Sequence, residues 1–86
     1  MHKVELTRTA EEAYRWLYRR DRRFFERITV ALWALADDPA LGKRLKGVFE
    51  GDWSCRIGSY RIIYTIVEAR GIVLILDIAH RRESYR

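Results

Sequence analysis

The sequence predicts an α+β domain with the element order β-α-α-β-β-β, in which a helical hairpin packs on one face of an antiparallel sheet. In the first half of the chain, apolar residues recur at helical spacing and are interrupted once, at residues 19–23. In the second half, strand-like runs are divided by glycine-containing turns. Because 86 residues support one modest hydrophobic core, we assign residues 1–86 to a single domain.

The first half should contain a short strand near residues 2–7 and two helices. Thr9 is followed three residues later by Glu12, a capping-box pattern that predicts the start of the first helix. Asp21 is the expected N-cap of the second helix, and Pro39 ends it because proline cannot continue a helix. The predicted core-facing stripe of the second helix is Phe24, Phe25, Ile28, Leu32, Leu35 and Ala36.

The second half reads as three strands joined by tight turns. Trp53–Ile57 and Tyr60–Val67 flank Gly58-Ser59, a two-residue hairpin turn. Arg70-Gly71 turns the chain again. Residues 72–78 are almost continuously apolar, which is typical of a central strand covered on both faces.

The chain is basic, with 17 Lys and Arg against 12 Asp and Glu, a net charge of +5. Such a charge fits a polyanionic partner, but it also fits a merely solvated arginine-rich surface. The sequence has one cysteine, no secretory apolar segment and no apolar run long enough to cross a bilayer. We therefore expect a cytoplasmic protein without a disulfide and without membrane contact.

Two arginines should face each other across the predicted hairpin. A two-residue loop at Gly58-Ser59 places Arg56 directly opposite Arg61, with Cβ atoms about 5 Å apart. Like charges in this position destabilise a sheet, so the pair makes sense if an anion lies between the guanidinium groups. The alternative is that both side chains extend into solvent or pair with acidic residues of the chain, namely Glu50, Asp52 or Asp77.

The polar C-terminal tail should extend this basic cluster. The last strand runs antiparallel to Tyr60–Val67, so either His80 or Arg81 shares the face of Arg61, depending on the register, and Tyr85 follows. Such a cluster suits RNA cleavage by the 2′-hydroxyl, which needs a proton acceptor, charge stabilisation at phosphorus and a proton donor, but no metal. Three further cations are either a solvated loop or the rim of a nucleic-acid groove: Lys43, Arg44 and Lys46.

No cofactor or metal is expected from the sequence. The two histidines, His2 and His80, lie at opposite ends of the chain, and Cys55 is the only cysteine. That distribution does not match the ligand spacing of a zinc site. A glycine-rich phosphate loop is missing as well.

The ordered motifs resemble the RelE branch of the RelE/ParE toxin superfamily. They are the segment Leu45-Lys46-Gly47, the strand Trp53–Ile57, the run GSYRIIY at residues 58–64 and the terminal IAHRRESYR at residues 78–86. The preceding strand and two helices match the element order of that family, so the resemblance covers essentially the whole chain. It implies a RelE-like fold and a metal-independent, ribosome-dependent endoribonuclease (an mRNA interferase) that cuts messenger RNA in the ribosomal A site and inhibits translation.

The resemblance also implies residue roles. Arg61 and Arg81 would bind phosphate and stabilise the transition state, and Arg56 matches a basic residue of the preceding strand. Arg81 or His80 would protonate the leaving oxygen, and Tyr85 would orient the scissile nucleotide or help to deprotonate its 2′-hydroxyl. Ser54 departs from the pattern, because the best-known members carry a lysine there.

The implied partners are the ribosome with its mRNA and an acidic, partly disordered antitoxin that wraps the toxin. Two other functions fit the same fold. One is a ParE-like gyrase inhibitor without nuclease chemistry, and the other is an antitoxin-binding relative whose site has decayed.

Overall fold

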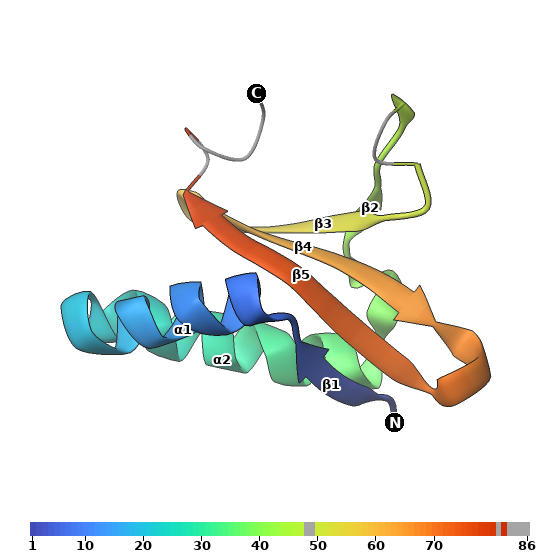
Figure 1. Cartoon of the computed structure of the whole chain (residues 1–86), viewed down its shortest axis with the longest axis horizontal. Coiled ribbons are helices and arrows are strands. Elements are labelled where there is room, and N and C mark those ends of the chain that lie inside the picture. The colour runs from blue at the N-terminus through green and yellow to red at the C-terminus, as the bar shows by residue number, and fades with distance from the viewer. Residues whose placement is uncertain (48–49, 81, 83–86) are drawn as a thin grey trace.

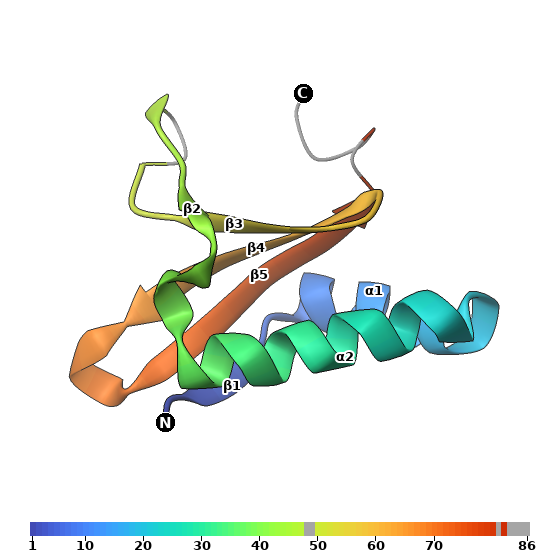
Figure 2. The same ribbon diagram turned by 180° about the vertical axis from the view of Figure 1, so that it is seen from behind.

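The computed structural model describes residues 1–47, 50–80 and 82, and it confirms the predicted arrangement of a helical hairpin on a sheet (Figure 1). The elements in chain order are β1 (Lys3–Leu6), α1 (Arg8–Arg20), α2 (Arg22–Asp37), the 3-10 turn η1 (Pro39–Leu41), β2 (Lys43–Arg44), β3 (Trp53–Ile57), β4 (Tyr60–Val67), the 3-10 turn η3 (Glu68–Arg70) and β5 (Ile72–His80). They form a five-stranded sheet in the order β1-β5-β4-β3-β2. Figures 1 and 2 show both helices on the same face of that sheet.

The helix starts are set by side chains that cap the backbone. Asp21 accepts a hydrogen bond from the Phe24 amide, as predicted for the N-cap of α2. The prediction for α1 is wrong by two residues, because Thr7 rather than Thr9 is the N-cap and accepts from the Ala10 amide. Thr7 also donates its hydroxyl to the Leu76 carbonyl at 2.8 Å, which ties the start of α1 to β5.

The sheet is mostly antiparallel, with one departure from the predicted pattern at each edge. β1 pairs with β5 in parallel, Lys3 opposite Ile72 and Leu6 opposite Ile75. This direction follows from the chain path, because β1 leads at Thr7 directly into α1, which packs along β5. At the other edge the two-residue β2 pairs with β3 and makes the basic stretch part of the sheet.

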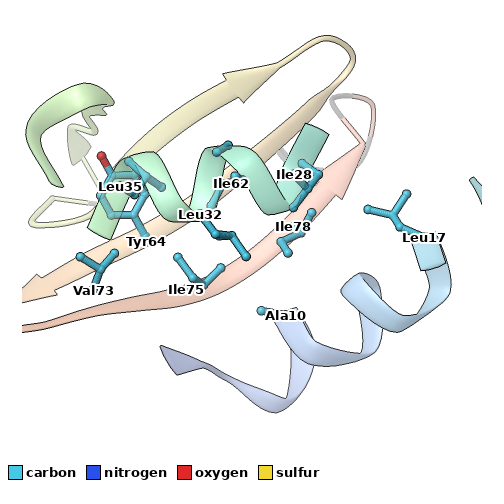
Figure 3. Packing of buried hydrophobic residues seen from close by; sticks show 11 residues of the cluster. Ala10, Leu17, Ile28, Leu32, Leu35, Ile62, Tyr64, Val73, Ile75 and Ile78 are labelled. Atoms are coloured by element: carbon cyan, nitrogen blue, oxygen red, sulfur yellow. The ribbon is translucent and has the colours of Figure 1, made fainter. Parts of the chain in front are cut away.

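The hydrophobic core lies between the helices and one face of the central strands (Figure 3). The largest fully buried side chains are Tyr64, Leu17, Ile28, Leu35, Ile62, Ile75 and Val73. The expectation that residues 72–78 are covered on both faces is wrong for the part of the chain that the structure describes. Two helices supply one covering layer, and Leu74 and Leu76 on β5 are only half-buried. Neither described helix has the length and apolar character needed to cross a membrane.

Candidate nucleic-acid interface

The β3–β4 hairpin creates the predicted arginine pair. Gly58 has φ +59°, a conformation that favours glycine and forms the tight turn. Ile57 therefore pairs with Tyr60, and Arg56 lies directly opposite Arg61. Sequence reasoning from turn length alone was sufficient to fix this register.

Both arginines belong to the sheet face that the helices leave uncovered. Ile62 and Tyr64 alternate with Arg61 along β4 and are fully buried against the helices, so Arg61 projects from the opposite face. Arg56 is exposed, whereas Arg61 is half-buried. On the next strand the partner of Arg61 is Ala79.

A surface hollow of about 430 Å³ joins this pair to the basic stretch of β2. Its described lining consists of Leu41, Gly42, Lys43, Arg44, Leu45, Ser54, Cys55, Arg56 and Arg61. Four of these nine residues are cations, and none of the described lining residues is a carboxylate. Lys46 lies outside this hollow, in an adjacent depression with Arg44, Trp53 and Glu50. Two of the three predicted groove residues thus lie with the arginine pair, and the third borders them.

A buried tyrosine that the sequence analysis did not single out holds the basic stretch in place. The Tyr64 hydroxyl donates to the Pro39 carbonyl at 2.6 Å and accepts from the Gly42 amide at 3.0 Å. A Cβ at Gly42 would lie 2.6 Å from both the Ser54 oxygen and the Tyr64 hydroxyl, so the chain passes too closely for a side chain. Burial raises the pKa of Tyr64, opposed by the hydrogen bond from Gly42, so the hydroxyl keeps its proton. The sequence could have pointed to Tyr64, because it is a tyrosine at a core-facing position of a strand, and a buried hydroxyl requires hydrogen-bond partners.

Cross-strand pairing orients the two β2 cations. Lys43 lies opposite Ser54, one row from the Arg56–Arg61 row and on the same face of the sheet. Arg44 lies opposite Trp53, with its guanidinium carbon 5.4 Å from the centre of the indole ring. This cation–π contact holds the Arg44 side chain on the face of Trp53, opposite to the face of Lys43 and the arginine pair.

The structure places His80 away from the arginine pair. His80 pairs with Tyr60 across the strands, and its ring meets the Tyr60 ring edge-on at 5.4 Å. It lines a different cavity, with Trp16 and Leu17 of α1. A symmetric connection between β4 and β5 would place His80 opposite Arg61. The observed connection spans residues 68–71, and the pairing has a bulge between Ile63 and Tyr64. The register therefore differs by one residue, and Ala79 takes the position opposite Arg61. The other two predicted residues of this group, Arg81 and Tyr85, lie outside the described residues.

Arg56 forms no ion pair with Glu50, Asp52 or Asp77, the described acidic residues that could have neutralised it. In residues 1–47, 50–80 and 82, no ion pair within 4 Å joins Arg56 to a carboxylate. Asp77 instead accepts a hydrogen bond from the Ile78 amide at 2.8 Å.

Burial raises the pKa of the Cys55 thiol, which disfavours the thiolate. Within the same described residues, no three His, Cys, Asp or Glu side chains are close enough to bind a metal ion.

Comparison with known proteins identifies the family of the chain. Residues 4–85 match a family model described as ParE toxin of type II toxin-antitoxin system, parDE. The chain is 35% identical to Toxin YoeB of Synechocystis over 93% of this chain and 99% of that protein. The crystal structure of the RelBE2 toxin-antitoxin complex from Mycobacterium tuberculosis contains a chain with a TM-score of 0.79 and 30% identity, matched over 93% of this chain and 98% of that one. The intact E. coli RelBE complex shares the fold, with a TM-score of 0.81 at 16% identity and full coverage of both chains. The chain therefore belongs to the RelE/ParE superfamily and is a toxin of the type II toxin-antitoxin class.

Proposed function

We propose that this toxin is an endoribonuclease that cleaves messenger RNA in the ribosomal A site without a metal ion. The observation that carries the proposal is the Arg56–Arg61 pair on the uncovered face of the sheet, in one hollow with Lys43 and Arg44. A stable sheet gains nothing from two like charges side by side, whereas a phosphate between them accepts hydrogen bonds from both guanidinium groups.

The chemistry assigned to this hollow is attack of a 2′-hydroxyl on its own phosphate. The bond from the 2′-oxygen to phosphorus forms, the bond to the 5′-oxygen breaks, and a 2′,3′-cyclic phosphate remains. Arg61 and Arg56 stabilise the extra negative charge on the phosphoryl oxygens. Arginine does not give up its proton readily, so neither side chain is suited to deprotonate the 2′-hydroxyl. We assign help in that deprotonation, or the orientation of the nucleotide, to Tyr85, and phosphate binding to Arg81; the leaving 5′-oxygen takes its proton from water.

Lys43 offers a replacement for the lysine that this chain lacks at Ser54. Because Lys43 is the cross-strand neighbour of Ser54, its ammonium group reaches the same row of the sheet from the adjacent strand. We propose that Lys43 contacts the phosphate next to the one held by the arginines. Arg44 and Lys46 would follow the RNA backbone along the rim.

The proposed protein partner is an acidic antitoxin that covers this basic surface. The proposal is supported by the likeness to a chain of the RelBE2 toxin-antitoxin complex of M. tuberculosis. It is also supported by the four cations of the hollow, which complement an acidic segment electrostatically. Bound there, the antitoxin would exclude RNA from the hollow.

A second candidate function is gyrase inhibition, because the family model that matches the chain carries the ParE description. The two functions differ in a direct readout. A gyrase inhibitor would stall DNA replication and leave ribosome-bound messages intact, whereas the proposed nuclease would produce A-site cuts.

The experiment is toe-printing of A-site cleavage on purified ribosomes that translate a defined message. Wild-type protein should produce cuts, Arg61→Ala should reduce the cleavage rate on the order of 10²-fold, and the distant Arg70→Ala should behave like wild type. Uncut message with wild-type protein, combined with inhibited gyrase, would replace this proposal with the second candidate.

A further inference from the structure

The turn between the two helices carries four arginines that the proposed active site does not use. Arg19 and Arg20 end α1, and Arg22 and Arg23 begin α2, with Asp21 between them. All four are exposed, and none makes an ion pair within 4 Å in the part of the chain that the structure describes. We call this group the arginine turn.

Helix electrostatics explain only half of the arginine turn. Arg19 and Arg20 lie in the last turn of α1, where the helix dipole favours cations. Arg22 and Arg23 occupy the first two positions of α2, where the dipole disfavours cations, and the first turn of α2 contains no acidic residue. Stability alone therefore does not account for four arginines in five consecutive residues.

Aromatic and cation–π contacts hold this turn against the end of the sheet that carries the arginine pair. The Phe24 ring, directly after the turn, lies 5.0 Å from the Tyr60 ring at the β3–β4 hairpin. The Arg27 guanidinium lies over the Phe24 ring and beside Gly58, with a nitrogen 3.2 Å from where a Gly58 Cβ would be. The helical turn and the hairpin turn thus occupy the same end of the molecule, opposite β1 and the β4–β5 connection (Figures 1 and 2).

The chemistry of the arginine turn fits a phosphate backbone better than a protein. Protein interfaces need an apolar centre, and here the exposed aromatic ring of Tyr18 is stacked under the Arg22 guanidinium at 3.9 Å. Three other large apolar side chains of the two helices are exposed. Trp16, one turn before Arg19 and Arg20 on α1, lines the cavity with Tyr60 and His80, whereas Val30 and Trp33 on α2 lie at least two helical turns from Arg22. Binding of duplex phosphates requires only positioned cations, which this surface supplies.

We propose that the arginine turn is a second RNA-binding surface, one that grips the backbone of double-helical ribosomal RNA while the Arg56–Arg61 hollow holds the message. The inference rests on the proposed ribosome-dependent function and adds to it the surface that docks the toxin. The arginine turn contributes affinity for the ribosome and takes no part in bond breaking.

The test compares two triple variants with the same change in net charge. One is Arg19→Gln/Arg20→Gln/Arg23→Gln, which spares Arg22 because its Nε donates to the Tyr18 carbonyl. The control is Lys3→Gln/Arg8→Gln/Arg70→Gln, at the opposite end of the molecule. Binding to purified ribosomes and to a short RNA duplex is measured over a series of salt concentrations, after thermal unfolding has shown that both variants fold.

The arginine-turn variant should lose affinity for both probes at least about tenfold. Its slope of log K against log salt should also become shallower by up to about 2.7, because three arginines are removed and each phosphate contact contributes about 0.9 on duplex nucleic acid. The control should stay close to wild type. Equal losses in both variants would reduce the effect to net charge and overturn the inference. Polyglutamate serves as a third probe that stands for an acidic protein. Unchanged RNA binding together with lost polyglutamate binding in the arginine-turn variant would assign the surface to an acidic protein, which also overturns the inference.

Failure of the proposed function is distinguishable from failure of this inference. If wild-type protein cleaves message on the ribosome and the arginine-turn variant binds and cleaves equally well, the inference alone is wrong. If wild-type protein does not cleave, but the arginine-turn variant still loses ribosome binding relative to the control, the nuclease proposal is wrong and the second surface stands.

Discussion

Replacing Tyr64 by phenylalanine should destabilise the protein by about 2 kcal/mol, although only one oxygen atom is lost. That hydroxyl bonds both the Pro39 carbonyl and the Gly42 amide, and the ring is fully buried. Without it, two half-buried backbone groups lose their partner, at about 1–3 kcal/mol for each fully buried group and less where water can enter. For a chain of this size, about 2 kcal/mol lowers Tm by about 8–16 °C.

The assay is thermal and denaturant unfolding followed by circular dichroism, with Tyr18→Phe as the matched control. Tyr18 is 48% exposed, and removal of its hydroxyl should change stability by less than about 0.5 kcal/mol. Tyr64→Phe should also weaken RNA cleavage in the folded protein, because Lys43 and Arg44 directly follow the anchored Gly42. Equal unfolding of the Tyr64 variant and wild type would refute the view that this hydroxyl anchors the basic stretch.

The same variant makes a prediction about pH. Burial raises the pKa of Tyr64 above its ordinary value of 10.0, so the folded state holds this proton more tightly than the unfolded chain does. The stability that this gives is complete below the pKa of an unfolded tyrosine and is lost as the pH rises through the folded-state pKa. Above pH 10.0, wild-type stability should therefore fall more steeply than that of Tyr64→Phe. Parallel curves would contradict the assignment, because the other four tyrosines are common to both proteins.

Three other substitutions test the framework around the site. Gly42→Ala should destabilise by about 1–3 kcal/mol in denaturant unfolding, because its Cβ would lie 2.6 Å from the Ser54 backbone oxygen; wild-type stability would mean that the chain can shift there at no cost. Asp21→Ala should cost about 1 kcal/mol through loss of the α2 N-cap, with Asp21→Asn close to wild type, and equal losses in both would point to charge rather than capping. Arg56→Gln should raise stability by about 0.2–1 kcal/mol at low salt while it lowers mRNA cleavage, since it relieves a like-charge pair; lower stability would mean that the pair is not repulsive.

The features that the sequence predicted well are those that local chemistry determines. A two-residue glycine turn sets the register of β3 and β4, so the position of Arg56 opposite Arg61 followed from loop length alone. Asp21 and Pro39 mark helix boundaries through backbone rules that need no tertiary context.

The features that were missed depend on contacts between distant segments. The choice of Thr7 over Thr9 as N-cap is coupled to the hydrogen bond from Thr7 to the Leu76 carbonyl, 69 residues away in sequence. The face of His80 depends on a bulge in the β4–β5 pairing, and a one-residue shift in register moves a side chain to the other face. No local sequence pattern predicts a bulge inside an apolar strand.

The anchoring role of Tyr64 was hidden for the same reason. Its partners Pro39 and Gly42 belong to a loop that precedes it by 22 residues or more. Alternation along β4 predicts burial of the ring, but burial alone does not say which backbone groups satisfy the hydroxyl.

The most direct test of the central claim, that the two facing arginines clamp one RNA phosphate, is a double-mutant cycle on single-turnover cleavage of ribosome-bound message. Arg56→Ala and Arg61→Ala should each slow cleavage, Arg61→Ala on the order of 10²-fold. The double variant should lose much less activity than the product of the two single losses, because both side chains act on the same phosphate. Effects that multiply independently, or an unchanged rate in Arg61→Ala, would contradict a shared phosphate clamp.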